Sequence, residues 1–209
     1  GGWAQPFNRA NYVIDCMPYE TRDRLGSQGG KREYFTKETW SQRDICSKEP
    51  FPFRDKEVDF VICSHTLEDV RDPIWVCQEI VRIAKRGYLE TPSRIVESCR
   101  GVESTSYSGY RHHRWFVESI DNNVIFTAKF PLVDYSWRYH FPLRYYQALD
   151  GEEKHFFLFW ESSFRFKETT FPFEPDSLPK NYEAFVYEHN GWPSYRYKLL
   201  NLRRFYRDS

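Results

Sequence analysis

A short apolar run and the helical pattern that follows it dominate the first half of the chain. Residues 58–64, "VDFVICS", are apolar and rich in β-branched side chains, which predicts a strand buried on both faces of a parallel sheet. Asp72 can cap a helix that starts at Pro73, and apolar residues then recur at spacings of three and four until Gly87 ends it. Residues 88–92, "YLETP", predict the next strand. This order indicates a βαβ unit with a right-handed crossover.

Two further strands are predicted upstream of this unit. Residues 11–15, "NYVID", end in the carboxylate of Asp15, and residues 34–46, "YFTKETWSQRDIC", lead through a strand-like segment to Asp44. Residues 25–31, "LGSQGGK", have the composition of a loop. The first half therefore predicts an α/β sheet domain.

The second half has a different pattern, with aromatic residues alternating with charged ones. Residues 114–130 hold two β-rich runs around the turn 121–123, and residues 154–171 repeat this arrangement around Ser162–Ser163. We expect antiparallel strands added to the same sheet. The tail, residues 195–209, fits a short amphipathic helix or a strand equally well. The period-2 aromatic residues fit the packed face of a sheet or a surface on which sugars or bases stack.

The expected fold class is thus α/β, with a mostly parallel sheet, antiparallel strands and a β-rich C-terminal elaboration. A chain of 209 residues is long enough for one sizeable core. We expect residues 1–106 to form the α/β core, and residues 107–209 to continue the same domain with an insertion on the substrate side.

The composition indicates which binding partners and which cellular compartment to expect. Thirty basic and thirty acidic residues cancel, so no net field favours nucleic acid or an anionic membrane. No apolar run approaches the roughly 18 residues of a membrane span, and no signal-peptide pattern opens the sequence, so a soluble protein is expected. The cysteines are odd in number and lack a C-x-x-C pair, which disfavours disulfides and a zinc ribbon and favours a reducing cytoplasm. They are Cys16, Cys46, Cys63, Cys77 and Cys99.

Polar side chains stand where the predicted strands end. In open α/β sheets, ligands bind outside the carboxyl ends of the strands, and Asp15, Asp44 and Ser64–His65 occupy such positions. A strand-end carboxylate can accept hydrogen bonds from ribose hydroxyls, and Asp44 can accept one from the exocyclic amine of adenine. Strand-end aspartates also cap helices and turns, so each position alone has two interpretations.

Residues 43–94 carry a resemblance to a known family. They run in order through an Asp and an apolar residue, "PFPF", the strand ending in "SHTLE", the "DP" helix, and "RIAKRGYLETP". In this order and spacing the segment, about a quarter of the chain, resembles the class I S-adenosylmethionine-dependent methyltransferases of type 11. The family has a double glycine where this chain has Arg86–Gly87, a difference confined to a turn.

The resemblance implies a Rossmann-like methyltransferase sheet and S-adenosyl-L-methionine as cofactor. It implies that Asp44 and Ile45 contact the adenine and that Asp15 binds the ribose. Ser64 and His65 occupy the loop that, in relatives, lies beside the cofactor's amino-acid portion and the methyl acceptor.

The first residues resemble the end of the family's glycine-rich turn, which lets the backbone approach the methionine part of the cofactor. Gly1, Gly2 and Trp3 are therefore expected to contact the cofactor. On this interpretation the first strand is missing from the sequence, and an apolar strand ending in an acid is expected before Gly1. The alternative is that the glycines are a cloning remnant.

Transfer of a methyl group from a sulfonium needs in-line positioning and exclusion of water, with a base where the acceptor is a hydroxyl. The candidate bases are His65, His112 and His113. The last two lie in "GYRHHRWF", residues 109–116, where relatives place acceptor-binding insertions, although a solvated or cross-strand pair is the competing interpretation. No metal site is expected, because adjacent histidines in a strand point to opposite faces.

The sequence therefore predicts an S-adenosylmethionine-dependent methyltransferase acting on a small-molecule or saccharide acceptor. The alternative is a non-catalytic module of the same fold that binds a glycan or a protein partner. Methylation of nucleic acid is disfavoured by the zero net charge and by the lack of an N-P-P-Y type motif after residue 62.

Overall fold

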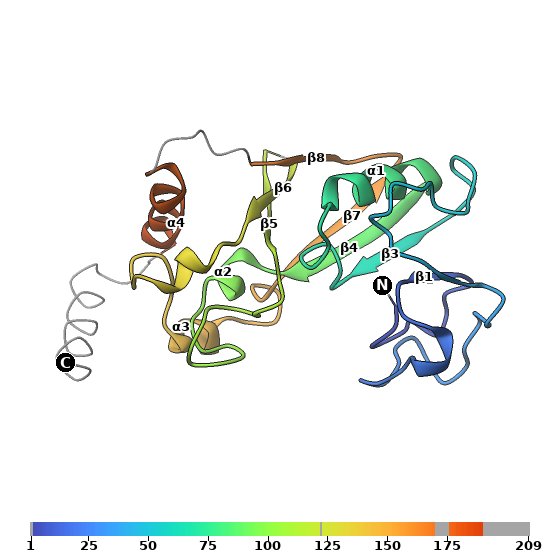
Figure 1. Ribbon diagram of the computed structural model, residues 1–209, viewed down its shortest axis with the longest axis horizontal. Helices are drawn as coiled ribbons and strands as arrows, with labels where there is room; N and C mark the ends of the chain where they lie inside the picture. Colours follow the sequence, from blue (N-terminus) through green and yellow to red (C-terminus); the bar gives the residue numbers. More distant parts are fainter. Residues whose placement is uncertain (1, 122, 170–175, 190–209) are drawn as a thin grey trace. The chain divides into compact units, whose positions relative to one another are not determined.

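The computed structural model describes residues 2–121, 123–169 and 176–189. These residues form a mixed α/β structure with short strands and few helices (Figure 1). In chain order the elements are β1 Val13–Asp15, η1 Tyr19–Thr21, β2 Trp40–Gln42, β3 Val61–Ser64, α1 Pro73–Ile83, β4 Arg86–Pro92, α2 Arg94–Glu97, β5 Trp115–Ile120, β6 Asn123–Ala128, η2 Pro131–Asp134, α3 Leu143–Ala148, β7 His155–Glu161, β8 Arg165–Glu168 and α4 Ser177–Glu188.

The chain divides into two compact units, and each is described by itself. Unit 1 comprises Gly1–Thr91, Val117–Phe126 and Phe156–Glu168. Unit 2 comprises Pro92–Phe116, Thr127–His155 and Thr169–Ser209. Residue 106, where the sequence analysis places its boundary, lies inside unit 2, and strands from the second half of the chain contribute to unit 1.

The two upstream strands form a parallel pair in unit 1. Val13 of β1 lies opposite Trp40 of β2, and Asp15 lies opposite Gln42. The aromatic ring of Phe35 packs with Val13 and Trp40 in a small core, which explains why such short strands hold their position. Both strands were expected from the sequence, and both are confirmed.

The predicted βαβ unit is confirmed in β3, α1 and β4. β3 and β4 are parallel, with Ser64 opposite Glu90. The Oδ1 atom of Asp72 accepts a hydrogen bond of 2.8 Å from the amide of Trp75, which caps α1 as expected. The helix ends at Ile83, however, so the prediction that Gly87 terminates it was wrong. Gly87 lies inside β4.

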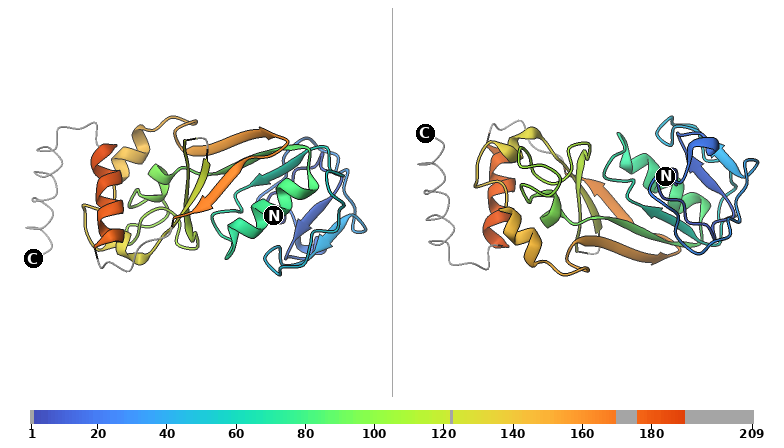
Figure 2. Two further views of the ribbon diagram at one scale, coloured as in Figure 1. Left: turned by 90° about the horizontal axis from the view of Figure 1, so that it is seen from above. Right: turned by 90° about the horizontal axis from the view of Figure 1, so that it is seen from below.

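The prediction that "VDFVICS" is buried on both faces was also wrong. The regular strand covers only Val61–Ser64, and Ile62 in its middle is 42% exposed. In the described residues β3 is the edge strand of a sheet ordered β3-β4-β7, so it has a neighbouring strand on one side only. Figure 2 shows these three strands side by side from two further directions.

The second aromatic segment turns where predicted, but its strands do not pair as a hairpin. β7 joins β4, whereas β8 pairs in parallel with β6, so the expectation of only antiparallel additions to one sheet was wrong. Ser162, with a φ of 63°, reverses the chain, and its amide donates to the carbonyl of Lys85. The Lys56 amine also donates to the Ser162 carbonyl at 2.7 Å. These long-range bonds direct β8 away from β7.

The first hairpin of the second half is confirmed as two neighbouring strands, β5 and β6, joined next to Asp121. In unit 2, Phe141 packs with Cys99 and Phe185 of α4, which ties the C-terminal helix to this unit. All five cysteines are free thiols, as the sequence predicted. No helix in the described ranges is long and apolar enough to cross a membrane. The tail, residues 195–209, lies outside the described residues.

Candidate active site

The carboxylate of Asp15, at the end of β1, holds the start of the chain. Its Oδ2 atom accepts hydrogen bonds from the amides of Gly2, at 2.7 Å, and Trp3, at 3.0 Å. Its Oδ1 atom accepts one from the amide of Met17 at 2.9 Å. The structure thus brings together three of the residues expected to bind the cofactor, while Gly1 lies outside the described residues.

Asp44 lies in the loop after β2 and is exposed. Its Oδ1 atom accepts a hydrogen bond from the amide of Cys46 at 2.8 Å, and its Oδ2 atom pairs with the Arg71 guanidinium at 2.6 Å. These two interactions, that with the Cys46 amide first, hold the pKa of Asp44 below its usual value. Ile45 beside it is half-buried.

Hydrogen bonds join the strand ends into one row. The amide of Arg43 donates to the carbonyl of Asp15 at 2.8 Å, so the loop after β2 runs beside the end of β1. Arg71, which follows β3, donates to the carbonyl of Cys46 at 2.7 Å. We call the ends of β1, β2 and β3, with their loops through Arg71, the strand-end row.

His65 stands at the β3 end of this row in a left-handed conformation, with a φ of 47°. Its amide donates to the Glu90 carbonyl at 2.9 Å, which fixes the backbone. The imidazole is half exposed, with Nδ1 3.6 Å from Oε1 of Glu68 and Nε2 3.2 Å from Oε1 of Glu90. The nearby Glu68 carboxylate is the main cause of a raised His65 pKa, and the charge of Glu90 adds to it, although burial acts in the opposite direction.

Glu90 of β4 also organises the hydroxyl groups around His65. Its Oε1 accepts a hydrogen bond of 3.0 Å from the Ser64 hydroxyl, and its Oε2 accepts one from the Tyr88 hydroxyl. Burial, followed by the bond to Glu90, raises the pKa of Tyr88 to about 12. Tyr88 therefore stays protonated at neutral pH and donates to the carboxylate.

Glu68 is the residue of this site that sequence reasoning missed. Its side chain is 1% exposed, and neither of its carboxylate oxygens accepts a hydrogen bond from any described residue. The His65 imidazole, with Nδ1 3.6 Å from Oε1, is its neighbouring titratable group. A glutamate three positions after a strand-end histidine was the available clue, but only the turn conformation of His65 brings the two side chains together.

His112 and His113 belong to unit 2, whereas His65 belongs to unit 1. His113 is buried, and its Nδ1 lies 2.7 Å from Oε1 of Glu97. His112 is exposed, and its ring centroid lies 4.4 Å from that of His113. Within unit 2 the His113 side chain is part of a buried ionic cluster around Glu97, because the Lys129 amine also pairs with Glu97 at 2.5 Å.

One comparison with known proteins finds a matching family model. The family model described as a methyltransferase domain, of type 11, matches residues 14–89. Residues 14–89, 76 of the 209 residues, are thus similar to a type 11 methyltransferase domain, which supports the resemblance drawn from residues 43–94. No curated protein and no solved structure matches the chain. The matched segment contains the whole strand-end row from Asp15 to Arg71.

Proposed function

We propose that the chain transfers a methyl group from S-adenosyl-L-methionine to a small-molecule or saccharide acceptor. The observation that carries this proposal is the strand-end row, in which Asp15, Asp44 and Ser64–His65 follow successive strands inside the matched segment. A Rossmann-like sheet in unit 1 is part of the proposal, with the parallel pairs β1/β2 and β3/β4 as its support. Five free thiols support a reducing compartment, the cytoplasm.

The carboxylates of Asp15 and Asp44 fit the hydroxyl and amine groups of a nucleoside. Oδ1 of Asp15 has a single amide partner, and a carboxylate oxygen can accept a second hydrogen bond, here from a ribose hydroxyl. Asp44 is engaged by Arg71, but both side chains are about half exposed. Exposed ion pairs contribute only about 0–1 kcal/mol, so the amine of an adenine can replace Arg71 at this carboxylate.

When bound, the cofactor supplies the methyl group and an excellent leaving group. His65 supplies the base in this proposal. The neutral imidazole accepts the proton of an acceptor hydroxyl, and the Glu68 carboxylate, 3.6 Å from Nδ1, favours the imidazolium that forms. Glu90 then stabilises the resulting imidazolium at 3.2 Å. His112 and His113 remain the competing candidates for the base.

A second candidate function is the non-catalytic module that binds a glycan or a protein. It is favoured because both carboxylates expected to bind the cofactor already have protein partners. Asp15 accepts hydrogen bonds from three backbone amides, and Asp44 forms an ion pair with Arg71. If the pair with Arg71 persists in solution, Asp44 is occupied, and only the second acceptor position on Oδ1 of Asp15 remains for the nucleoside.

Turnover separates the two functions. The full chain is incubated with S-adenosyl-L-methionine and a panel of small hydroxyl compounds and saccharides, and homocysteine is detected with a coupling enzyme. We expect turnover with at least one acceptor, and a loss of about 100-fold or more in His65→Ala, because a general base contributes on that scale. His112→Ala is the matched control, expected to retain activity. Equal activity of both variants would remove His65 as the base.

A further inference from the structure

The sheet β3-β4-β7 has one packed face and one exposed apolar face. Cys63 of β3 and Leu89 of β4 lie opposite each other and are both buried, so they mark the packed face. Successive side chains of a strand point to opposite faces, which places Ile62 and its partner Tyr88 on the other face. Ile62 is 42% exposed there, so this second face is open to solvent at β3.

Hydrogen bonds at both ends of β7 set its register against β4. The amide of Ser93 donates to the carbonyl of Lys154 at 2.9 Å. At the other end, the amide of Ser162 donates to the carbonyl of Lys85 at 2.7 Å. β7 therefore runs antiparallel to β4, and both bonds agree on the same register.

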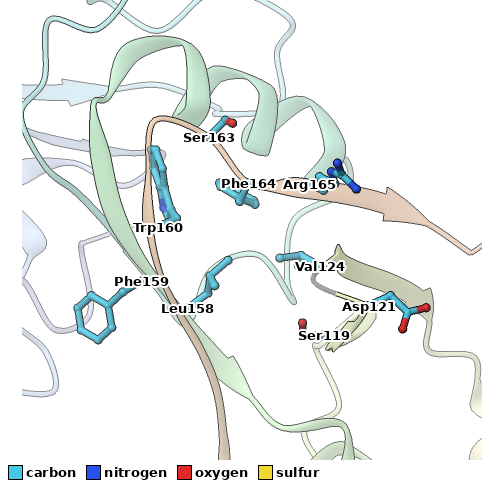
Figure 3. A pocket seen from close by; sticks show the side chains of 9 residues that line it. All are labelled: Ser119, Asp121, Val124, Leu158, Phe159, Trp160, Ser163, Phe164 and Arg165. Atoms are coloured by element: carbon cyan, nitrogen blue, oxygen red, sulfur yellow. The ribbon is translucent and has the colours of Figure 1, made fainter.

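This register adds two phenylalanine rings to the exposed face. Phe159 lies opposite Tyr88, with ring centroids 4.7 Å apart, and Phe157 lies opposite Glu90. Phe159 is 68% exposed and Phe157 is 47% exposed. Figure 3, which draws the pocket beside β7, shows the Phe159 side chain on the other side of the strand from that of Leu158. We call this surface the apolar face; it consists of Ile62, Tyr88, Phe157 and Phe159.

The apolar face ends at the candidate base. Ser64 and Glu90 follow on the same side of β3 and β4. Nε2 of His65 lies 3.2 Å from Oε1 of Glu90. The Tyr88 hydroxyl donates to Oε2 of the same carboxylate, so Glu90 joins the apolar face to the imidazole. A molecule that lies on the apolar face therefore reaches His65 with one end.

The apolar face favours an acceptor with an apolar body. Burial of ring and C–H groups against it is favourable, whereas the hydroxyls of a saccharide pressed against it would lose water without gaining hydrogen bonds. At the end near the base, the hydroxyls of Ser64 and Tyr88 both donate to Glu90. The arrangement therefore suits an acceptor that presents one hydroxyl to His65.

A phenolic hydroxyl matches this base. A phenol has a pKa of about 10, as in tyrosine, far below that of an aliphatic alcohol, so a neutral imidazole can take its proton. We propose that the apolar face binds a neutral aromatic ring whose phenolic hydroxyl lies beside His65 and is the methyl acceptor. The acceptor role rests on the proposed methyltransferase function, whereas binding of the ring does not.

The transfer balances with the groups named. The phenolic proton passes to the His65 imidazole, and the phenol oxygen bonds to the methyl carbon as the carbon–sulfur bond breaks. The products are an aryl methyl ether and S-adenosylhomocysteine, and the imidazolium then releases the proton to solvent.

Binding of 2-naphthol tests the site without turnover. The full chain is titrated with 2-naphthol, and binding is followed by saturation transfer to the naphthol protons in NMR spectra. Phe159→Ala should weaken binding about tenfold, because it removes one ring contact and the area buried on it. Tyr34→Ala, which removes another exposed ring of unit 1, is the matched control and should leave binding unchanged. Both variants change exposed side chains, so both should fold.

Turnover then tests the acceptor role. The full chain is given S-adenosyl-L-methionine with 2-naphthol, cyclohexanol or glucose. We expect methylation of 2-naphthol, with a KM about tenfold higher in Phe159→Ala and unchanged in Tyr34→Ala. Naphthol binding that depends on Phe159, without any methyl transfer, would uphold the binding site and overturn both the acceptor role and the methyltransferase function.

The remaining outcomes overturn the inference. Methylation of glucose but not of 2-naphthol would do so while upholding the methyltransferase function. Equal binding of 2-naphthol by Phe159→Ala and Tyr34→Ala would also do so. Sedimentation of both variants covers the other occupant of an apolar face, a second copy of the chain. A dimer that Phe159→Ala dissociates, with naphthol binding unchanged, would show that the face joins two copies instead.

Discussion

Nδ1 of His65 lies 3.6 Å from Oε1 of Glu68. This carboxylate is 1% exposed and accepts no hydrogen bond from any described residue. The two side chains differ in exposure, since that of His65 is half exposed and that of Glu68 is buried. The imidazole can exchange protons with solvent or with an acceptor, while the glutamate behind it is closed off from solvent. The pair therefore sets the pH at which His65 is free to act as a base.

The first prediction concerns the titration of His65. Replacing Glu68 with Gln removes the main cause of the raised pKa, so the pKa of His65 should fall in Glu68→Gln. Glu90→Gln, which removes a smaller contribution, should lower it less. NMR titration of the His65 Cε1 proton measures both, and an unchanged pKa in Glu68→Gln would contradict the assigned role. Any base-dependent limb of the pH–rate profile should move to lower pH with it.

The same shift links His65 to stability. Because its pKa is raised in the folded state, its contribution is fully present below the unfolded pKa of about 6.5 and is lost as the pH rises through the folded value. The side chain is half exposed, so we expect less than about 1 kcal/mol. Urea denaturation of wild type and His65→Gln across this window measures the difference. A difference that grows with rising pH would have the wrong sign.

The second prediction concerns Gly87. A Cβ there would lie 2.6 Å from the carbonyl oxygen of Val61 and 2.9 Å from Trp160, and neither backbone nor buried indole can yield easily. Gly87→Ala should cost about 1–3 kcal/mol of unfolding free energy. Gly151→Ala, with nothing within 4 Å of the added carbon, is the control and should cost much less. Equal urea midpoints would show that β3 and Trp160 do not press on Gly87.

The strand β4, which contains Gly87, shows which parts of the fold could be predicted from the sequence. The apolar pattern located β3, α1 and β4 because each follows a local rule, and the capping aspartate marked the start of the helix. It could not show that the turn at Ser162 would bond to Lys85, more than seventy residues earlier, and so send β8 to β6. Glu68 was missed for a similar reason, since its importance depends on the conformation of His65.

The third prediction concerns the cap of α1. The Oδ1 atom of Asp72 accepts the amide of Trp75, so Asp72→Ala should cost about 1 kcal/mol of unfolding free energy. Asp59, whose exposed carboxylate pairs with Lys85 at 2.6 Å, provides the control, because Asp59→Ala breaks only a surface ion pair. Denaturation curves for both variants decide the matter. A loss no larger in Asp72→Ala than in Asp59→Ala would refute the capping role.

The fourth prediction concerns the buried ionic cluster of unit 2. Glu97 is 0% exposed, and despite the opposing effect of burial its pKa is lowered by His113 and Lys129. Lys129→Met removes one of the two side-chain partners of that buried carboxylate and should cost about 3–5 kcal/mol. Lys180→Met, on the exposed face of α4, is the matched control and should cost under about 1 kcal/mol. Similar thermal midpoints for the two variants would mean that the Lys129–Glu97 pair does not stabilise the fold.

Calorimetric titration of the full chain with S-adenosylhomocysteine tests the central claim most directly. The account predicts measurable binding at millimolar ligand or below, severely weakened in Asp44→Ala and unchanged in Asp55→Ala, which removes an exposed carboxylate paired with Arg82 instead. No binding by the folded chain at millimolar ligand, or equal binding by Asp44→Ala, would contradict it.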